Sequence, residues 1–212
     1  MTVASHNELV IVGGGGHGRE LFDAARGEWR IRGFVDEDPG VEDRLARIGS
    51  LLLGGIEWLE ANPSRYALGI GTSSDRRKLA TRLDRAGCQV ATVVHPGVSR
   101  GSDVRLANGV VVFDRCTLTT NVEIGAHTHL NVGCAVQHDS TVGSFVQMSP
   151  GVLVNGDCVI GNDVFLGTGA IVTRGCTIGD GARVGAGSVV LDDVPPGAFA
   201  FGTPAQRQSA RK

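Results

Sequence analysis

Two neighbouring residues, His138 and Asp139, are of the types that proton transfer requires. A histidine paired with a carboxylate can act as a general base near neutral pH, because the carboxylate fixes the tautomer of the ring and raises its basicity. Gly156 follows His138 after eighteen residues. If this glycine lies beside the histidine, its backbone N–H can stabilise an oxygen on which negative charge develops. The alternative is that all three residues belong to surface turns, where glycine is common.

A six-residue repeat decides whether these residues meet. Every sixth residue from Val98 to Val194 is small or β-branched, and every sixth residue from Leu106 to Val190 is aliphatic or methionine. Neither a helix nor an uninterrupted strand has this period, whereas a parallel β-helix of short strands and turns does. The pattern therefore predicts an all-β parallel β-helix in which both sets of residues form the core.

Three hexapeptides complete one triangular coil of such a fold, so residues eighteen apart lie about 4.8 Å above one another. This spacing predicts that Gly156 stacks on His138. It also predicts that four inward cysteines stack in pairs, Cys116 with Cys134 and Cys158 with Cys176. We expect these thiols to be reduced core residues, since the chain has no C-x-x-C pair and buried apolar thiols are inert.

Three histidines in the repeat raise the alternative of a zinc site. His127 and His129 flank the inward Thr128 on one turn, so we expect both to point outward. His138 is nine residues, or half a coil, from His129. Since a zinc site needs ligands that converge on one ion, this arrangement predicts no metal.

A glycine-rich segment, residues 13–18, stands between a predicted strand at 8–12 and a predicted helix at 19–26. Backbone N–H groups of such a loop can approach a diphosphate, and the helix N-terminus favours its negative charge. The segment matches G-x-G-x-x-G, a weak motif that the strand and helix on either side make more specific.

Two acidic residues, Asp36 and Glu37, follow a second predicted strand at 30–35, about twenty positions after the glycines. This position suits a contact with a ribose hydroxyl. A solvated turn before Pro39 is the competing interpretation.

The remainder of this half predicts further alternation of strands and helices. Helices are expected at 56–61 and 74–85, and strands at 65–70 and 88–94. We therefore predict a small α/β Rossmann-like domain at 1–95, with three or four parallel strands that hold one nucleotide moiety, and the repeat domain at 96–212.

The composition excludes several classes of function. With 20 basic and 22 acidic side chains among 212 residues, the formal net charge is −2, so we expect neither a nucleic-acid-binding nor a membrane-binding surface. The longest apolar runs are too short to span a bilayer. We see no basic segment followed by a long apolar run at the N-terminus, so we expect a cytoplasmic protein without a signal peptide.

These segments resemble the hexapeptide-repeat acyltransferases, and the resemblance implies that the β-helix is an all-β left-handed parallel β-helix. The sequence GAGSVVLDDVPPGAFAFGTPA at 185–205 is similar to the end of the acetyl-CoA-binding domain of that superfamily. The sequences VIVGGGGHGRE and GFVDED near the N-terminus resemble the sialic acid O-acetyltransferase (NeuD) type, which includes bacterial nucleotide-aminosugar N-acetyltransferases. The resemblance extends from about residue 8 to residue 205.

The resemblance implies a homotrimer that transfers acetyl from acetyl-CoA to an amino group of a UDP- or GDP-linked aminosugar, without a metal. His138 would be the general base, Asp139 its acidic neighbour and Gly156 the amide near the acetyl oxygen. Nucleotide-sugar contacts would fall on Gly14, His17, Gly18, Asp36, Glu37, Gly71 and Thr72. Coenzyme contacts would fall on Gln147, Gly156, Gly167, Gly185 and Pro204.

Two positions depart from some members of that family. Gln147 stands where some relatives have a second histidine, and Asp139 where others have glutamate. Three alternatives stay open: transfer to a sugar hydroxyl such as that of sialic acid, a zinc hydratase, and a nucleotide-binding subunit without catalytic activity.

Overall fold

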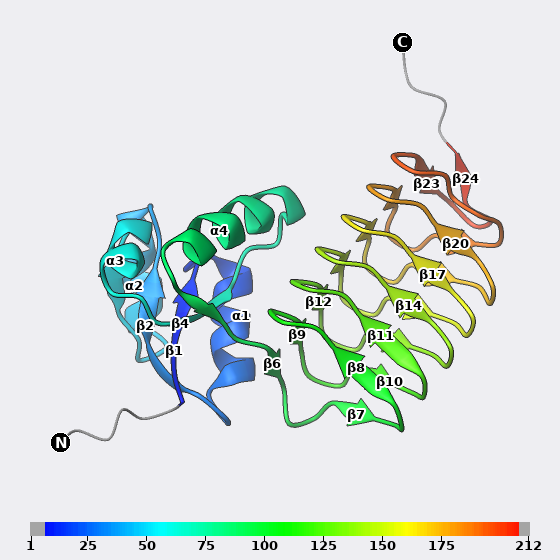
Figure 1. Ribbon diagram of the computed structural model, residues 1–212. Coiled ribbons are helices and arrows are strands. Elements are labelled where there is room, and N and C mark those ends of the chain that lie inside the picture. The colour runs from blue at the N-terminus through cyan, green and yellow to red at the C-terminus, as the bar shows by residue number, and fades with distance from the viewer. Residues whose placement is uncertain (1–6, 208–212) are drawn as a thin grey trace, which may run out of the picture. The chain divides into compact units, whose positions relative to one another are not determined.

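The computed structural model describes residues 7–207 of the chain. The chain divides into two compact units between Val93 and Val94, two residues before the predicted boundary. The first unit mixes helices and strands, and the second consists of stacked coils (Figure 1).

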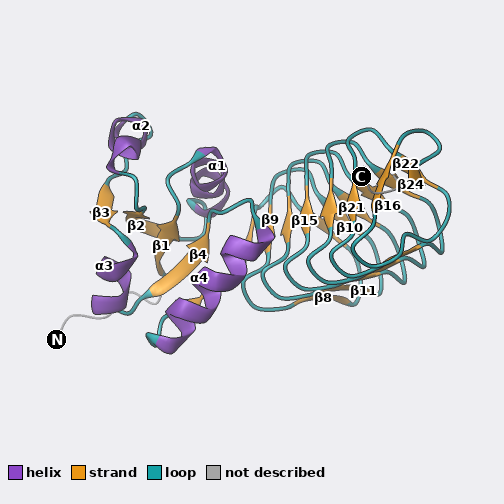
Figure 2. Cartoon of the chain, turned by 90° about the horizontal axis from the view of Figure 1, so that it is seen from above, coloured by secondary structure: helices purple, strands orange, loops and turns teal. Residues whose placement is uncertain are grey.

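The first unit is a doubly wound parallel sheet. Its strand order is β3-β2-β1-β4-β5, with helices α1 and α2 on one side and α3 and α4 on the other (Figure 2). The strands are β1 (Glu8–Val12), β2 (Arg30–Val35), β3 (Leu52–Gly54), β4 (Arg65–Leu68) and β5 (Gln89–Val90). The helices are α1 (Gly16–Ala25), η1 (Pro39–Val41), α2 (Glu42–Ala46), α3 (Ile56–Ala61) and α4 (Ser73–Arg85).

The sheet has five strands, so the prediction of three or four was wrong. The additional strand β3 is only three residues long and half-buried, too short to show a period in the sequence. The predicted strand at 88–94 is split: β5 completes this sheet, whereas β6 (Val93–Val94) begins a sheet of the coils. Among residues 7–207, no helix is both long enough and apolar enough to cross a bilayer.

Close backbone packing brings the start of α1 against the ends of β1 and β4. A Cβ atom on Gly18 would overlap the carbonyl oxygen of Gly13, and one on Gly69 would overlap the Cα of Gly18. The neighbours of β1 are β2 on one side and β4 on the other. The strand order therefore reverses at this edge, which is where doubly wound folds bind ligands.

The second unit is a left-handed parallel β-helix with three faces, confirming the predicted fold (Figure 1). The first face contains β7 (Ser99–Arg100), β10 (Thr117–Leu118), β13 (Ala135–Val136), β16 (Leu153–Val154), β19 (Ile171–Val172) and β22 (Val189–Val190). The second face contains β8 (Val104–Leu106), β11 (Val122–Ile124), β14 (Thr141–Val142), β17 (Val159–Ile160) and β20 (Thr177–Ile178). The third face contains β6, β9 (Val111–Val112), β12 (His129–Leu130), β15 (Gln147–Met148), β18 (Phe165–Leu166), β21 (Arg183–Val184), β23 (Phe199–Phe201) and β24 (Gln206–Arg207).

The register between coils is eighteen residues up to β22, whereas the last coil is two residues shorter, because Arg183 pairs with Phe199 and Ile178 with Val194. Thr117 pairs with Ala135, which pairs with Leu153, which pairs with Ile171. The aliphatic column fills the interior, where residues such as Leu118 are fully buried. Up to Val190 the repeat stacks equivalent positions without an inserted loop, as the sequence predicted. The prediction that Val194 belongs to the small column was wrong, because the last coil lacks two residues and Val194 lies in register with Ile178 of the aliphatic column.

The small inward column has a second role beside filling space. Its polar members donate to turn carbonyls fifteen residues further along: Cys116 Sγ to Asn131 O at 3.1 Å, Cys134 Sγ to Ser149 O at 3.2 Å, and Ser140 Oγ to Asn155 O at 3.0 Å. A buried carbonyl without a donor is costly, so these side chains stabilise the corners of the prism. All five cysteines are free and buried, and the burial of the four in the small column confirms that they are core residues.

We predict that Gly18→Ala destabilises the first unit by about 3 kcal/mol or more, because the new methyl group overlaps backbone that cannot move aside. Urea denaturation followed by fluorescence measures this change, since Trp29 and Trp58 both lie in the first unit. Gly15→Ala is the matched control: its Cβ would meet nothing within 4 Å, so a change within about 0.5 kcal/mol is expected. Equal stability of the two variants would contradict the packing described.

Candidate active site

The proposed base and its neighbour meet at the corner between the first and second faces. His138 and Asp139 lie in the turn between β13 and β14, and His138 Nδ1 is 2.8 Å from Asp139 Oδ2. Adjacent side chains usually diverge, but Asp139 has a φ of 59°, a left-handed conformation that folds the carboxylate back to the ring. With the carboxylate ionised, Nδ1 carries the hydrogen, which leaves Nε2 as the proton acceptor.

The other oxygen of this carboxylate is also engaged. Asn121, one coil earlier, donates from Nδ2 to Asp139 Oδ1 at 2.9 Å. The hydrogen bonds from Asn121 and His138 hold the pKa of Asp139 below its usual value. Asp139 therefore stays ionised at neutral pH and can stabilise a protonated His138.

Gly156 lies directly against the ring of His138. A Cβ atom on Gly156 would come within 2.5 Å of both Cε1 and Nε2 of the histidine. Any larger residue at this position would displace the ring. The eighteen-residue stacking thus brings the predicted amide donor and the predicted base together, as the sequence indicated.

Two further charged residues stand on the following coils. Arg174 Nε donates to Asp157 Oδ2 at 2.7 Å. One ligand atom each of His138, Asp139 and Asp157 lies within 4.8 Å of the others, and this is the only such group of three in the part of the chain that the structure describes. Asn121 and Arg174 already bond to its two carboxylates, and the arginine opposes a cation. We therefore assign no metal to it.

The three histidines considered for zinc do not come together. His127 stacks on the ring of Phe145, with the ring centroids 4.8 Å apart. His129 sits on β12 beside the inward Leu130 and is fully buried. Neither belongs to the group around His138. We predicted the direction of the His129 side chain and not its exposure, and alternation along a strand gives only the direction.

The predicted coenzyme residues other than Gly156 lie away from the dyad. Gln147 is on the third face, Gly167 and Gly185 are at the corner between the third and first faces, and Pro204 precedes β24. Close packing accounts for the glycines: a Cβ would come 2.6 Å from Ala186 N at Gly167, and 2.8 Å from Phe201 Cβ at Gly185. A single β-helix therefore does not bring these residues to His138.

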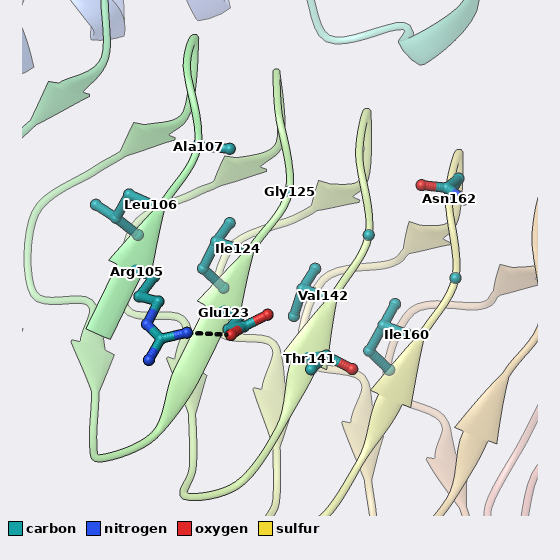
Figure 3. Close-up of a pocket in the computed structure, with 12 residues that line it drawn as sticks. Arg105, Leu106, Ala107, Glu123, Ile124, Gly125, Thr141, Val142, Ile160 and Asn162 are labelled. Carbon is teal, nitrogen blue, oxygen red and sulfur yellow. Dashed lines mark hydrogen bonds and ion pairs between the residues drawn. The ribbon is translucent and has the colours of Figure 1, made fainter. Parts of the chain in front are cut away.

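A groove on the second face was not predicted. It has a volume of about 460 Å³ and crosses β8, β11, β14 and β17. Arg105 Nη1 bonds to Glu123 Oε1 at 3.0 Å at its margin (Figure 3). Gly125 and Gly143 line the groove and leave it open, because they have no side chains. Only glycine fits at these positions, since a Cβ atom on either would overlap the backbone of the next coil. The groove could have been predicted from the glycines that recur directly after residues of the aliphatic column.

The predicted nucleotide residues of the first unit gather at the carboxyl edge of its sheet. Gly14 N–H donates to Asp36 Oδ2 at 2.6 Å, and Asp38 N–H donates to Asp36 Oδ1 at 2.9 Å. Glu37 Oε1 accepts from Ile56 N–H at 3.1 Å, at the start of α3. Both carboxylates thus hold backbone in place, and they line a cavity of about 100 Å³ beside Gly13 and Ile70.

A buried arginine, Arg76, completes this edge, and the sequence analysis missed it. It is fully buried on α4, and its Nη1 donates to Ile70 O at 3.0 Å and to Gly71 O at 2.8 Å. It thereby fixes the loop that carries Gly71 and Thr72, two of the predicted contacts. Its burial could have been predicted from its spacing, because Arg76 lies on the same face of α4 as the buried Ala80 and Leu83.

His17 is neutral at physiological pH. Burial, and then the positive charge of Arg76, lower its pKa to about 4. The Glu20 carboxylate is 3.8 Å from Nδ1 but exposed, so its opposite effect is outweighed. The glycine loop and the start of α1 therefore present a neutral imidazole.

This pKa predicts a pH-dependent stability of the first unit. The unfolded state binds a proton near pH 6.5 and the folded state only near pH 4, so the free energy of unfolding falls as the pH drops through this window, by up to about 3 kcal/mol. Urea denaturation at several pH values, followed by tryptophan fluorescence, measures the slope. His17→Gln should flatten it; equal slopes in the two proteins would contradict the assignment.

Comparisons with known proteins agree with both units. The PglD N-terminal domain matches residues 8–83, and the bacterial transferase hexapeptide (six repeats) matches residues 157–192. A search of curated proteins found no match. Among solved structures, WeeI from Acinetobacter baumannii is 27% identical over 94% of this chain and 99% of its own, with a TM-score of 0.86.

A perosamine N-acetyltransferase from Caulobacter crescentus, PerB, is more similar. It was solved in complex with CoA and GDP-perosamine, and is 32% identical over 97% of this chain and 99% of its own, with a TM-score of 0.89. Structures of the same enzyme with a substitution at one histidine match equally well in TM-score. The chain is therefore a member of the hexapeptide-repeat sugar acetyltransferases of the NeuD/PglD type.

Proposed function

We propose that this protein transfers an acetyl group from acetyl-CoA to the amino group of a UDP- or GDP-linked aminosugar. The observation that carries the proposal is the His138–Asp139 pair packed on Gly156, an arrangement suited to acyl transfer. The similarity to an enzyme solved with CoA and GDP-perosamine supports the two substrates.

The chemistry follows from the geometry of the pair. The amine nitrogen of the sugar attacks the thioester carbon, and its proton passes to Nε2 of His138. Asp139 stabilises the imidazolium that forms. The N–H of Gly156 would donate to the carbonyl oxygen as it becomes negative. When the C–S bond breaks, the proton leaves with the coenzyme thiol. No acyl-enzyme is needed, because the thioester is already activated.

A homotrimer is part of this proposal. Gln147, Gly167, Gly185 and Pro204 lie on faces and corners of the prism remote from the corner that holds His138. If these residues bind the coenzyme, they present it to the His138–Asp139 pair of a neighbouring subunit. The site is then completed only between neighbouring prisms.

The nucleotide would bind at the carboxyl edge of the first unit. Gly14, Gly71 and Thr72 lie there in loops that Asp36 and Arg76 fix. Gly18 lies beside the neutral His17 in the first turn of α1. The position is the reversal point of the strand order, which supports a nucleotide site. The cytoplasm remains the proposed compartment, in keeping with five buried cysteines that form no disulfide.

We predict that His138→Ala lowers kcat at least roughly a hundredfold with little change in the KM for acetyl-CoA, because a general base contributes 10²–10⁴-fold. Thiol release from the coenzyme measures the rate. His127→Ala, a histidine outside the dyad, is the control and should keep kcat within a factor of about three. Near wild-type turnover of the His138 variant would overturn the role of the base.

The acceptor is tested with a panel of UDP-aminosugars, GDP-aminosugars and free sialic acid. We expect one of the aminosugars to stimulate thiol release from acetyl-CoA, and its product to be heavier by one acetyl group, carried on the amine nitrogen. Acetylation of sialic acid alone would overturn the amine assignment in favour of a hydroxyl acceptor, which the same base could serve. Absence of both acetyl-CoA binding by calorimetry and thiol release would overturn the enzymatic proposal in favour of a nucleotide-binding subunit.

A further inference from the structure

One corner of the prism carries a ladder of short polar residues. Asp103, Asn121, Asp139 and Asp157 stand eighteen residues apart, each with a φ between 53° and 59°, and Gly175 follows with a φ of 78°. Asn and Asp tolerate this left-handed conformation better than other residues with a side chain. Three of the four side chains are carboxylates. Asn121, next to the dyad, is the neutral exception.

The amide of Asn121 completes the set of bonds around Asp139. Its Nδ2 donates to Oδ1 at 2.9 Å, while Oδ2 faces His138 Nδ1 at 2.8 Å. A carboxylate held by only one oxygen can rotate about its last torsion, which is broad. Held at both oxygens, it presents a fixed acceptor to Nδ1. The ring orientation and the tautomer of His138 then follow from the position of Asn121.

The charges around the dyad show why an amide suits this position. On the coils that follow, Asp157 is paired with Arg174, which donates at 2.7 Å. On the preceding coil Asn121 supplies a hydrogen bond without a charge. A carboxylate there would place a second negative charge beside Asp139, and would favour the protonated form of His138. That form cannot accept a proton.

We propose that Asn121 is a positioning residue of the active site, which fixes the Asp139 carboxylate, and through it the tautomer and orientation of His138, without adding charge. The inference rests on the proposed function, in which Nε2 of His138 accepts the proton. Asn121 touches neither substrate in this scheme and acts through Asp139.

Two substitutions at Asn121 separate the effect of orienting the Asp139 carboxylate from the effect of adding charge beside it. Asn121→Gly removes the amide but is compatible with the left-handed backbone, which Gly175 adopts three rungs further along. Asn121→Asp keeps the shape but replaces the amide donor with a negative charge. Asp103→Asn is the matched control, because it changes a charge on the same ladder in a residue bonded to Arg105.

The tautomer and titration of His138 are measured by ¹⁵N NMR on the resting protein, and kcat and KM by thiol release. Asn121→Gly should lower kcat roughly tenfold, leave the KM for acetyl-CoA within about twofold, and reduce the fraction of the ring protonated at Nδ1. Asn121→Asp should move the acidic limb of the pH–rate profile, and the pH dependence of the His138 ¹⁵N signals, to higher pH. Asp103→Asn should change none of these.

An Asn121→Gly protein with the wild-type tautomer and kcat, or an Asn121→Asp protein with an unshifted titration, would overturn the inference. A Gly variant that fails to fold leaves the Asp variant as the test. Because NMR needs no turnover, the two proposals fail separately. A wild-type protein that acetylates no acceptor overturns the proposed function, while the spectra still decide the role of Asn121.

Discussion

The whole second unit depends on one constraint, the eighteen-residue register of its parallel hydrogen bonds. Each strand is only two or three residues long and has little stability of its own. Its backbone N–H and C=O groups form hydrogen bonds with the coils before and after it, and its inward side chain packs within the aliphatic column. An insertion or deletion in one coil would shift the corners of all the coils that follow. The stacking of Gly156 on His138 is a direct consequence of this uniform register.

Backbone conformation at the corners decides which residues can stand there. A triangular coil turns sharply, and most turns place one residue in the left-handed region. Glycine, asparagine and aspartate are therefore favoured at these positions for a reason unrelated to function. Asp139 shows how chemistry arises from that constraint: the conformation required by the turn is also the one that brings its carboxylate to the neighbouring imidazole.

The two candidate sites differ in how their charges are buried and compensated. At the corner of the prism the charges are half-exposed and compensated, since Asp139 faces His138 and Asn121 while Asp157 faces Arg174. In the first unit a cation is fully buried, held by carbonyl oxygens, and a neutral histidine lies within reach of its field. The first arrangement suits proton transfer in contact with solvent, whereas the second suits an anionic ligand.

The sequence by itself determined the β-helix, its register, and the meeting of His138 with Gly156, because a six-residue period allows one way of stacking coils. It also indicated the glycine loop of the first unit and the approximate domain boundary. Tertiary structure alone decided the rest. The register places Asn121 one coil before Asp139, but only the structure shows the hydrogen bond between their side chains. Arg76 binds the carbonyl oxygens of Ile70 and Gly71 because helix packing buries its side chain against the preceding loop. The bond of Asp36 to Gly14 and the pairing of β3 with β2 join residues about twenty positions apart in a domain without a repeat, and no local pattern records which distant group a residue will face.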